Sequence, residues 1–287
     1  MTFKKTDVYA ITAGRMLQVW GVKPTEVRDW DKEVSYRVSF LKETLLNAGR
    51  SALVLGISGG VDSLVAGKLC QLAAESLRSD GHEARFIAMR LPYGRQLDED
   101  DAQKALSFID PDQVVTVNIQ ASVDAMEAVV TQECPATDHR MADFERGNVK
   151  ARMRMVAQYQ VSALNNGLVV GTDHNAEAVT GFFTKWGDGA CDVLPLRGLN
   201  KRQVRLLAVA LGASDELAYK PATADLEDLR PQLHDEAALG ISYDIIDDFL
   251  EGKGGPSDDI SDLVDIYEKT QHKRCPQPEA YCAPETE

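Results

Sequence analysis

Residues 58–63, which read SGGVDS, combine two hydroxyls, two glycines and an acid. An apolar segment at 53–55 precedes them and apolar residues at helical spacing follow, so the pattern predicts a strand, a glycine loop and a helix. Backbone N–H groups in such a loop point to one place at a helix N-terminus, which favours phosphate. The hydroxyls of Ser58 and Ser63 add donors, and Asp62 adds a carboxylate for a divalent cation. The alternative is an ordinary glycine-rich turn.

A second group of polar residues, 173–189 (DHNAEAVTGFFTKWGDG), directly follows another apolar segment at 168–172. Glu177 at the end of this expected strand is, like Asp62, an oxygen ligand suited to Mg²⁺. Asp188 lies between two glycines and could accept a proton, although an Asp flanked by glycines is also typical of a turn. His174 and Glu177 are three residues apart, which by itself is weak evidence for zinc.

Asn148 and Arg152 lie one turn apart on a long helix expected from Glu145 onward. This spacing would let an amide and a guanidinium bind one ligand together, and surface exposure without function is the alternative. Arg90 ends another expected strand, 84–91, at the edge where open α/β sheets bind ligands. It could therefore contact a nucleotide.

The elements that must position these residues alternate between strand and helix. Expected strands at 53–55, 84–91, 113–119 and 168–172 are separated by helical patterns, which predicts an α/β fold. The sheet should be parallel and doubly wound, with right-handed crossovers and helices on both faces. Residues 134–144 read as a mobile loop, and 258–269 as a helix.

The whole chain, 1–287, is expected to form one domain. An extension at 1–24 precedes a helix within 25–49, which Thr25 could cap and which either covers the sheet or contacts a second subunit. Residues 51–212 form the expected nucleotide-binding core. A lid at 214–235 and C-terminal helices make up 213–274, and a proline-rich tail at 275–287 is expected to be disordered.

A formal net charge of −14 argues against a nucleic-acid or anionic membrane partner, because both require a broad positive surface. We expect a cytoplasmic protein, since no segment has the length of a membrane span and the N-terminus lacks the apolar core of a signal peptide. The five cysteines are odd in number and show no C-x-x-C spacing, so free thiols are expected.

The hexad at 58–63 does not fit the Walker A pattern, because no Gly-Lys-Ser/Thr closes the loop. It resembles the pyrophosphate-binding loop of the ATP pyrophosphatase superfamily. The run at 173–189 is similar to that of the ammonia-dependent NAD synthetases, as are 199–204 (LNKRQV), 220–226 (KPATADL), 239–244 (LGISYD) and 272–274 (HKR). The likeness extends from about residue 25 to residue 274 and implies a Rossmann-like fold of the adenine nucleotide alpha-hydrolase type.

This resemblance implies a C–N bond-forming ligase, which amidates deamido-NAD with ammonia to give NAD. The substrate carboxylate would first attack the α-phosphate of ATP and form an acyl-adenylate, with pyrophosphate leaving, and AMP would leave when ammonia attacks. The implied catalytic residues are Asp62, Glu177, Asp188 and Lys201, with Mg²⁺ bound by Asp62 and Glu177. The implied ATP-binding residues are Gly56, Ile57, Ser58, Gly59, Gly60, Val61, Asp62, Ser63, Arg90, Thr172, Lys201 and Thr223.

For deamido-NAD, the resemblance implies contacts from Phe144, Asn148, Arg152, Lys185, Asp192, His272 and Lys273, and an aromatic ring at Phe144 could stack on the nicotinate. It also implies a homodimer with this substrate near the interface. Two residues depart from the expected pattern. Ala238 replaces a glutamate, which puts one contact to the substrate ribose in doubt, and Val61 replaces a frequent glutamine, from which we expect little effect.

Three other functions fit the sequence less well. A glutamine-dependent form of the enzyme would need an additional amidohydrolase domain, for which 287 residues leave no room. A tRNA-thiolating enzyme is disfavoured by the acidic charge and the absence of paired redox cysteines. A non-catalytic nucleotide-binding module could keep the glycine loop but lose the distant polar residues, whereas Glu177, Lys201 and Thr223 are all present.

Overall fold

The computed structural model describes residues 5–94, 99–224, 226–255 and 257–278. Its main sheet has four parallel strands in the order β3-β2-β1-β4. They are β1 (Ala52–Gly56), β2 (Arg85–Arg90), β3 (Gln113–Thr116) and β4 (Gly167–Val169). The order reverses at β1, which pairs with β2 on one side and β4 on the other, and ligands bind at such a switch point in open α/β sheets. The loop at 57–60 leaves β1 at this point.

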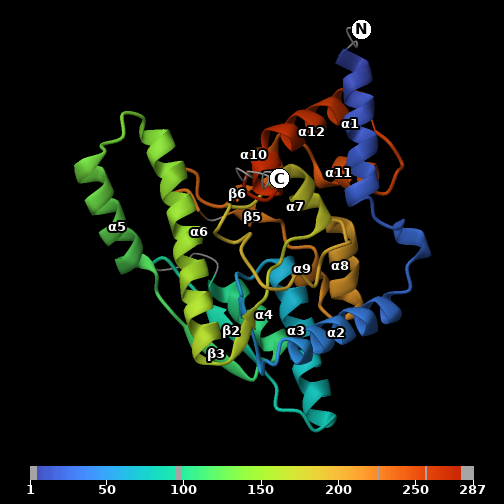
Figure 1. The fold of residues 1–287 in the computed structure, drawn as a ribbon, viewed down its shortest axis with the longest axis vertical. Coiled ribbons are helices and arrows are strands. Elements are labelled where there is room, and N and C mark those ends of the chain that lie inside the picture. Colours follow the sequence, from blue (N-terminus) through green and yellow to red (C-terminus); the bar gives the residue numbers. More distant parts are fainter. Residues whose placement is uncertain (1–4, 95–98, 225, 256, 279–287) are drawn as a thin grey trace, which may run out of the picture.

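Helices cover both faces of the sheet, which confirms the predicted α/β class (Figure 1). Alternate residues of a strand point to opposite faces. Leu53 and Phe86 pack into a large core with helices α2 (Trp30–Asn47), α3 (Val61–Ser79) and α8 (Lys201–Ala210). Val54 and Ile87 point the other way and pack near the long helix α6 (His139–Leu164).

A second core lies beside the sheet, where helices from the two ends of the chain pack with α7 (Figure 1). It combines α1 (Lys5–Trp20), α7 (Asn175–Thr180), α11 (Tyr243–Leu250) and α12 (Ser257–Lys269) through buried residues such as Met16, Val179, Ile246 and Leu263. Helix α7 therefore rests on this second core, while the loop after β1 rests on the first.

The remaining elements are short or peripheral. They are α4 (Glu99–Ile109), α5 (Gln120–Glu133), α9 (Asp215–Ala218), α10 (Asp235–Leu239), the 3-10 turns at Thr25–Val27 and Gln271–Lys273, and a hairpin of β5 (Thr223–Ala224) and β6 (Leu233–His234). The predicted lid region contains α9 and this hairpin. Part of it is held against α6, where Lys150 donates to the Leu226 carbonyl oxygen at 2.9 Å and binds Asp228 at 2.6 Å.

The structure corrects three expectations about local structure. The helix placed within 25–49 begins at Trp30, because Asp29 rather than Thr25 caps it by accepting from the Lys32 N–H. Residues 1–24 include helix α1, whose apolar side packs on the second core. The loop at 134–144 is shorter than predicted, since Asp138 caps α6 and Phe144 lies on that helix.

Other expectations concern cysteines, membrane spans and the tail. Cys70, Cys134, Cys191 and Cys275 are free thiols, as predicted, and Cys282 lies outside the described residues. None of the described helices has the length and apolar character needed to cross a membrane. Most of the tail predicted at 275–287 also lies outside the described residues.

Candidate active site

The loop between β1 and α3 forms a compact cradle at the switch point. Ser58 and Ser63 face each other, with their Oγ atoms 3.2 Å apart, and the Gly60 N–H donates to Ser58 Oγ at 3.2 Å. Gly59 has a φ of +92°, and a Cβ there would lie 2.9 Å from the Ala102 backbone nitrogen of α4. Both the backbone conformation and the close approach require glycine at this position. Gly60 is the N-cap of α3, so N–H groups of the first turn face the loop.

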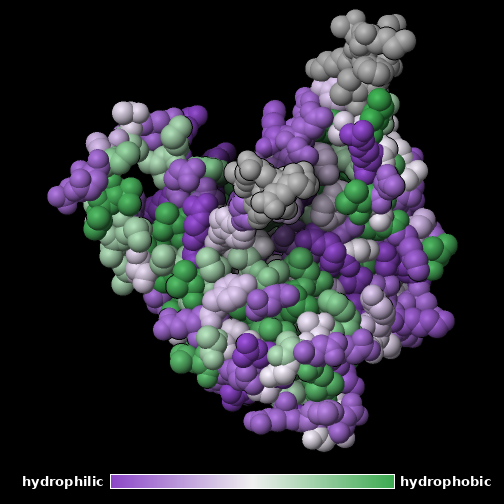
Figure 2. Space-filling model, in the orientation of Figure 1, coloured by the Kyte–Doolittle hydropathy of each residue, from purple (hydrophilic) through white to green (hydrophobic). Residues whose placement is uncertain are grey.

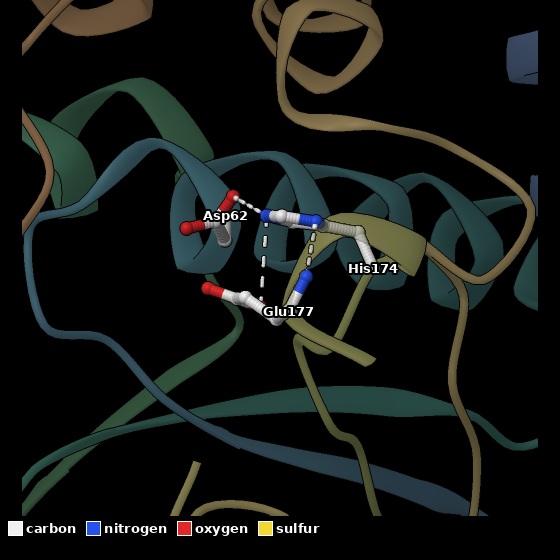
Figure 3. A group of neighbouring side chains, drawn as sticks. All are labelled: Asp62, His174 and Glu177. Carbon is white, nitrogen blue, oxygen red and sulfur yellow. Dashed lines mark hydrogen bonds and ion pairs between the residues drawn. The ribbon is translucent and has the colours of Figure 1, made fainter. Parts of the chain in front are cut away.

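An acid cluster lies beside this cradle, and we define it as Asp62, His174 and Glu177, which Figure 3 shows, together with Lys201. Asp62 is in the first turn of α3, Glu177 is in the first turn of α7, and Lys201 is the first residue of α8. Lys201 Nζ lies 2.7 Å from Asp62 Oδ2 and 3.9 Å from Glu177 Oε1. Segments far apart in the sequence therefore bring these side chains to one point.

The electrostatics of the cluster follow from burial and mutual charge. Burial disfavours the ionised form of Asp62, but Lys201 and His174 together outweigh it and hold the pKa of Asp62 well below its usual range. Burial, followed by the negative charge of Asp62, raises the pKa of Glu177 well above its ordinary value. Burial alone would lower the pKa of Lys201, yet the charges of Asp62 and Glu177 raise it. The site therefore has more carboxylates than cations to balance them.

The two acids fit a divalent cation. An oxygen of Asp62, an oxygen of Glu177 and a nitrogen of His174 lie within 4.8 Å of one another. Asp62 Oδ1 is buried, and among the described residues it accepts no hydrogen bond of ordinary geometry, although His174 Nε2 lies 3.4 Å away. A buried carboxylate oxygen that is so weakly satisfied is costly unless a cation or another partner binds it. Carboxylate oxygens are also the protein ligands that Mg²⁺ prefers.

A cavity of about 290 Å³ opens in front of the cradle and the cluster. Of the residues predicted to bind ATP, those that line it are Gly56, Ile57, Ser58, Gly60, Val61, Asp62, Ser63, Arg90, Thr172, Lys201 and Thr223. Gly59 is in the loop but does not line the cavity, because it lies against α4. Met89 and Val170 supply an apolar part of the lining, so the cavity has a polar end at the loop and an apolar region nearer the strands.

Two of the predicted residues have structural partners as well as access to the cavity. Arg90 donates to the Ile57 carbonyl oxygen and binds Glu99 at 2.8 Å, so it ties β2 to the loop and to α4. Asp188 lines the cavity while its Oδ1 accepts from the Thr184 N–H at 2.9 Å, as a turn residue does. Burial raises the pKa of Asp188, which makes its carboxylate a stronger proton acceptor.

The residues predicted to contact deamido-NAD form a separate outer set, which comprises Phe144, Asn148, Arg152, Lys185, Asp192, His272 and Lys273. None of these seven described residues lines the cavity. Asn148 accepts from Thr184 Oγ1 at 2.8 Å, Arg152 donates to the Lys185 carbonyl oxygen at 3.4 Å, and Lys185 donates to that of His272 at 2.7 Å. These contacts connect α6, the loop after α7 and the C-terminal 3-10 turn.

The other members of the outer set differ in exposure and partners. Lys273 donates to the Gly181 and Phe183 carbonyl oxygens at 2.8 and 2.7 Å, near the C-terminal end of α7. Asp192 accepts from the Val169 N–H at 2.7 Å, which fixes it against β4. Phe144 is 52% exposed, and no stacking partner for its ring is present among the described residues.

Sequence reasoning missed several residues that line the cavity, among them Gln158, Lys220 and Asp235. Gln158 of α6 accepts from the Gly56 N–H at 2.8 Å and so caps the end of β1. Lys220 lines the cavity and pairs with Asp101 of α4 at 2.8 Å. Asp235 is buried beside Tyr243, whose hydroxyl lies 3.3 Å from Asp235 Oδ2. Lys220 lies within the motif at 220–226 and Asp235 ends the predicted lid at 214–235, whereas nothing in the sequence around Gln158 marks it.

A phosphate cradle at the switch point of a parallel sheet, with two acids and a lysine beside it, defines an enzyme of the nucleotide-binding α/β class. The family model for NAD synthase matches residues 33–277. A protein of Shewanella pealeana named NH(3)-dependent NAD(+) synthetase is 57% identical over 257 residues, which cover 87% of this chain and 93% of that protein. The chain therefore belongs to the NAD synthase family, as its sequence motifs predict.

Other relatives agree with this assignment. A Streptomyces coelicolor protein with the same name is 56% identical over 250 residues, covering 87% of this chain and 91% of that protein. The crystal structure of an NAD+ synthetase from Burkholderia pseudomallei superposes with a TM-score of 0.78 at 48% identity, covering 96% of this chain and 98% of the other. An NMN synthetase from Francisella tularensis superposes with a TM-score of 0.75 at 29% identity, covering 90% and 100%.

Proposed function

We propose that this protein is a ligase that amidates deamido-NAD with ammonia, using ATP and producing NAD, AMP and pyrophosphate. The observation that carries the proposal is the convergence of Asp62, Glu177 and Lys201 beside the SGGVDS loop. These groups suit the transfer of an adenylyl group from ATP to a carboxylate. The identity of 57% to a named NH(3)-dependent NAD(+) synthetase over most of both chains supports the same reaction.

In the first step, the loop at 56–63 would hold the phosphates of ATP. Its N–H groups and the Ser58 and Ser63 hydroxyls supply donors to the β- and γ-phosphates, and the N-terminus of α3 adds a favourable dipole. Lys201 would place its ammonium against the phosphates as negative charge develops on the leaving pyrophosphate. Thr172 and Thr223 line the same cavity and would contact the nucleotide.

Asp62 and Glu177 would hold Mg²⁺, which when bound neutralises phosphate charge and orients the α-phosphate for attack. The buried Asp62 Oδ1, which accepts no hydrogen bond of ordinary geometry from any described residue, supports this role. Lys201 keeps Asp62 ionised before ATP arrives. The carboxylate of deamido-NAD would then attack the α-phosphate to give the acyl-adenylate, and pyrophosphate would leave.

In the second step, ammonia would attack the acyl-adenylate and release AMP. The attacking nitrogen must lose a proton, and Asp188 is placed at the cavity to accept it. Its turn contact with the Thr184 N–H fixes one oxygen and leaves the other for this role. The raised pKa of Asp188 brings the carboxyl closer to the pH at which it exchanges protons efficiently.

Deamido-NAD would bind along the outer set, which supplies an aromatic ring, an amide and several cations. We also propose a homodimer with this substrate near the interface. Exposed apolar side chains on α5 and α6, namely Met126, Val129, Val130, Met141, Phe144, Val156 and Leu164, support a contact surface there (Figure 2). Helix α2 buries Leu41 and Leu45 in the main core, yet Tyr36 and Leu46 remain exposed for a second contact.

The test is to supply purified protein with ATP, Mg²⁺, an ammonium salt and either deamido-NAD or nicotinate mononucleotide. Formation of NAD and AMP in equal amounts from deamido-NAD supports the proposal. Amidation of the mononucleotide alone would support the second function suggested by the NMN synthetase neighbour. Absence of AMP with both substrates would contradict both functions. Replacement of ammonium by glutamine should abolish the product, and sedimentation equilibrium tests the dimer.

A further inference from the structure

His174 lies at the centre of the acid cluster, and neither the loop nor the proposed chemistry uses it. Its side chain is fully buried, and Figure 3 shows the imidazole reaching from the start of α7 toward Asp62 and Glu177. His174 Nε2 is 3.4 Å from Asp62 Oδ1 and 3.6 Å from Glu177 Oε2. Within the described residues, Nε2 makes no hydrogen bond that meets ordinary geometric limits. A buried ring nitrogen aimed at two acids requires an explanation.

The other ring nitrogen indicates which tautomer is present. His174 is the N-cap of α7, and its Nδ1 accepts from the Glu177 N–H at 3.4 Å. An accepting nitrogen carries no proton, so the neutral ring carries its proton on Nε2. The Nε2–H group therefore points into the space between the two carboxylates.

This tautomer argues against His174 as a third metal ligand. A ring nitrogen coordinates a metal through its lone pair, and a protonated Nε2 has none available. Mg²⁺ also prefers oxygen ligands to imidazole. The sequence spacing of His174 and Glu177 thus reflects a helix cap rather than a zinc site.

In each of the two acids, the two carboxylate oxygens have different neighbours. Asp62 Oδ2 and Glu177 Oε1 are the oxygens nearest Lys201 Nζ, at 2.7 and 3.9 Å. The second oxygens, Asp62 Oδ1 and Glu177 Oε2, are those nearest His174 Nε2. Each acid therefore has one oxygen toward the ammonium and one toward the imidazole. Helix α7 fixes the imidazole, since the same residue that caps the helix also faces the acids.

We propose that His174 is a positioning residue, whose Nε2–H is the donor that sets the separation and orientation of Asp62 and Glu177 for one divalent cation. The proposal rests on the metal-binding role given above to these two acids. It assigns two tasks to a single ring. Nδ1 holds the start of α7, and Nε2–H holds the carboxylates. The two tasks can be separated by replacing His174 with Asn or Gln, because the side-chain amide of each reproduces one of the two ring nitrogens.

Two variants separate the tasks. His174→Asn places an oxygen near the position of Nδ1 and removes the donor at Nε2, so the cap is kept and the acids lose their donor. His174→Gln can place an amide N–H near the position of Nε2 and removes the cap. Mn²⁺ binding in the presence of α,β-methylene-ATP, followed by electron paramagnetic resonance, reports on the acids. Thermal unfolding without metal reports on the cap.

We expect His174→Asn to weaken Mn²⁺ binding by about 10- to 100-fold, which is the usual effect of removing a group that orients metal ligands. Its unfolding temperature should stay near that of the natural protein. We expect His174→Gln to lower the unfolding temperature and to retain Mn²⁺ affinity within about threefold, a small loss compared with that range. Equal loss of Mn²⁺ affinity in both variants, or no loss in either, would overturn the proposal.

The tautomer can be observed directly. In protein labelled with ¹⁵N-histidine, the His174 resonances are those missing from the spectrum of His174→Asn. We expect an unprotonated Nδ1 and a protonated Nε2, both without metal and after addition of Mg²⁺ with α,β-methylene-ATP. Loss of the Nε2 proton on addition of Mg²⁺ would make His174 a ligand and contradict the proposal. Because these measurements do not depend on turnover, a failure to form NAD would refute the proposed reaction without deciding the role of His174.

Discussion

The acid cluster and the outer set differ in how completely one chain assembles them. In the cluster, buried side chains from α3, α7 and α8 contact one another directly, as in the Lys201–Asp62 pair at 2.7 Å. In the outer set, Lys185 and Lys273 bind backbone carbonyl oxygens, and the aromatic ring of Phe144 is exposed. The groups proposed to act on ATP are therefore positioned before substrate arrives. The groups proposed to bind deamido-NAD still have to exchange protein contacts for substrate contacts.

The largest expected effect on kcat comes from a substitution in the acid cluster. Asp62→Asn removes the charge that Lys201 balances and one of two proposed metal ligands, so we expect kcat to fall by roughly 10²- to 10³-fold. The KM for deamido-NAD should change little, because the outer set is untouched. Steady-state formation of AMP measures both quantities. Asp80→Asn, at the exposed C-terminal end of the same helix, is the matched control and should behave as the natural protein. Full activity in Asp62→Asn would remove the metal role.

Glu251 supports the start of helix α8, whose first residue is Lys201 of the acid cluster. It is buried and accepts from Asn200 Nδ2 at 2.9 Å, and Asn200 is the N-cap of α8. Burial opposes the charge of Glu251, but hydrogen bonds from Lys253, Thr25 and Asn200 lower its pKa to about 2. A carboxylate with a lowered folded-state pKa stabilises the fold above its unfolded pKa, near 4.5, and this stabilisation is lost as pH falls toward 2.

Glu251→Gln should therefore reduce the free energy of unfolding by about 1–3 kcal/mol at pH 7, because buried donors lose a charged acceptor. Denaturant titrations at a series of pH values should show this difference shrinking below about pH 4.5 and vanishing near pH 2. Asp248→Asn changes a half-exposed acid nearby and should cost less. A difference that stays constant with pH would show that the carboxylate charge is not what stabilises the start of α8.

A substitution in the outer set should change the KM for deamido-NAD, whereas a substitution in the acid cluster should change kcat. Arg152→Gln removes a guanidinium whose recorded hydrogen bond is to the Lys185 carbonyl oxygen. We expect the KM for deamido-NAD to rise about tenfold, equivalent to about 1.4 kcal/mol, while the KM for ATP stays the same. Arg140→Gln, at the exposed start of the same helix, is the control. A rise in the KM for ATP alone would mean that Arg152 belongs to the other site.

The same contrast explains what the sequence could predict. Strand–loop–helix order and the parallel sheet are local patterns, and they place Asp62 and Glu177 after neighbouring strands, so their convergence was predictable. Helix α1 was missed because its apolar residues match a surface made by α7, α11 and α12, which periodicity alone does not reveal. Gln158 was missed for a similar reason, since its bond to the Gly56 N–H joins residues 102 positions apart.

The smallest expected effect concerns Phe144, whose ring is 52% exposed. If it stacks on the nicotinate, Phe144→Ala should raise the KM for deamido-NAD by about fivefold, because an aromatic pair contributes about 1 kcal/mol beyond its buried area. Met141→Ala changes an apolar residue of similar exposure one turn away and should leave this KM unchanged. If both variants instead weaken the dimer in sedimentation equilibrium and leave the KM alone, the exposed face of α6 is a subunit contact. The outer set would then lose its aromatic member, and recognition of the dinucleotide would depend on its amide and cations.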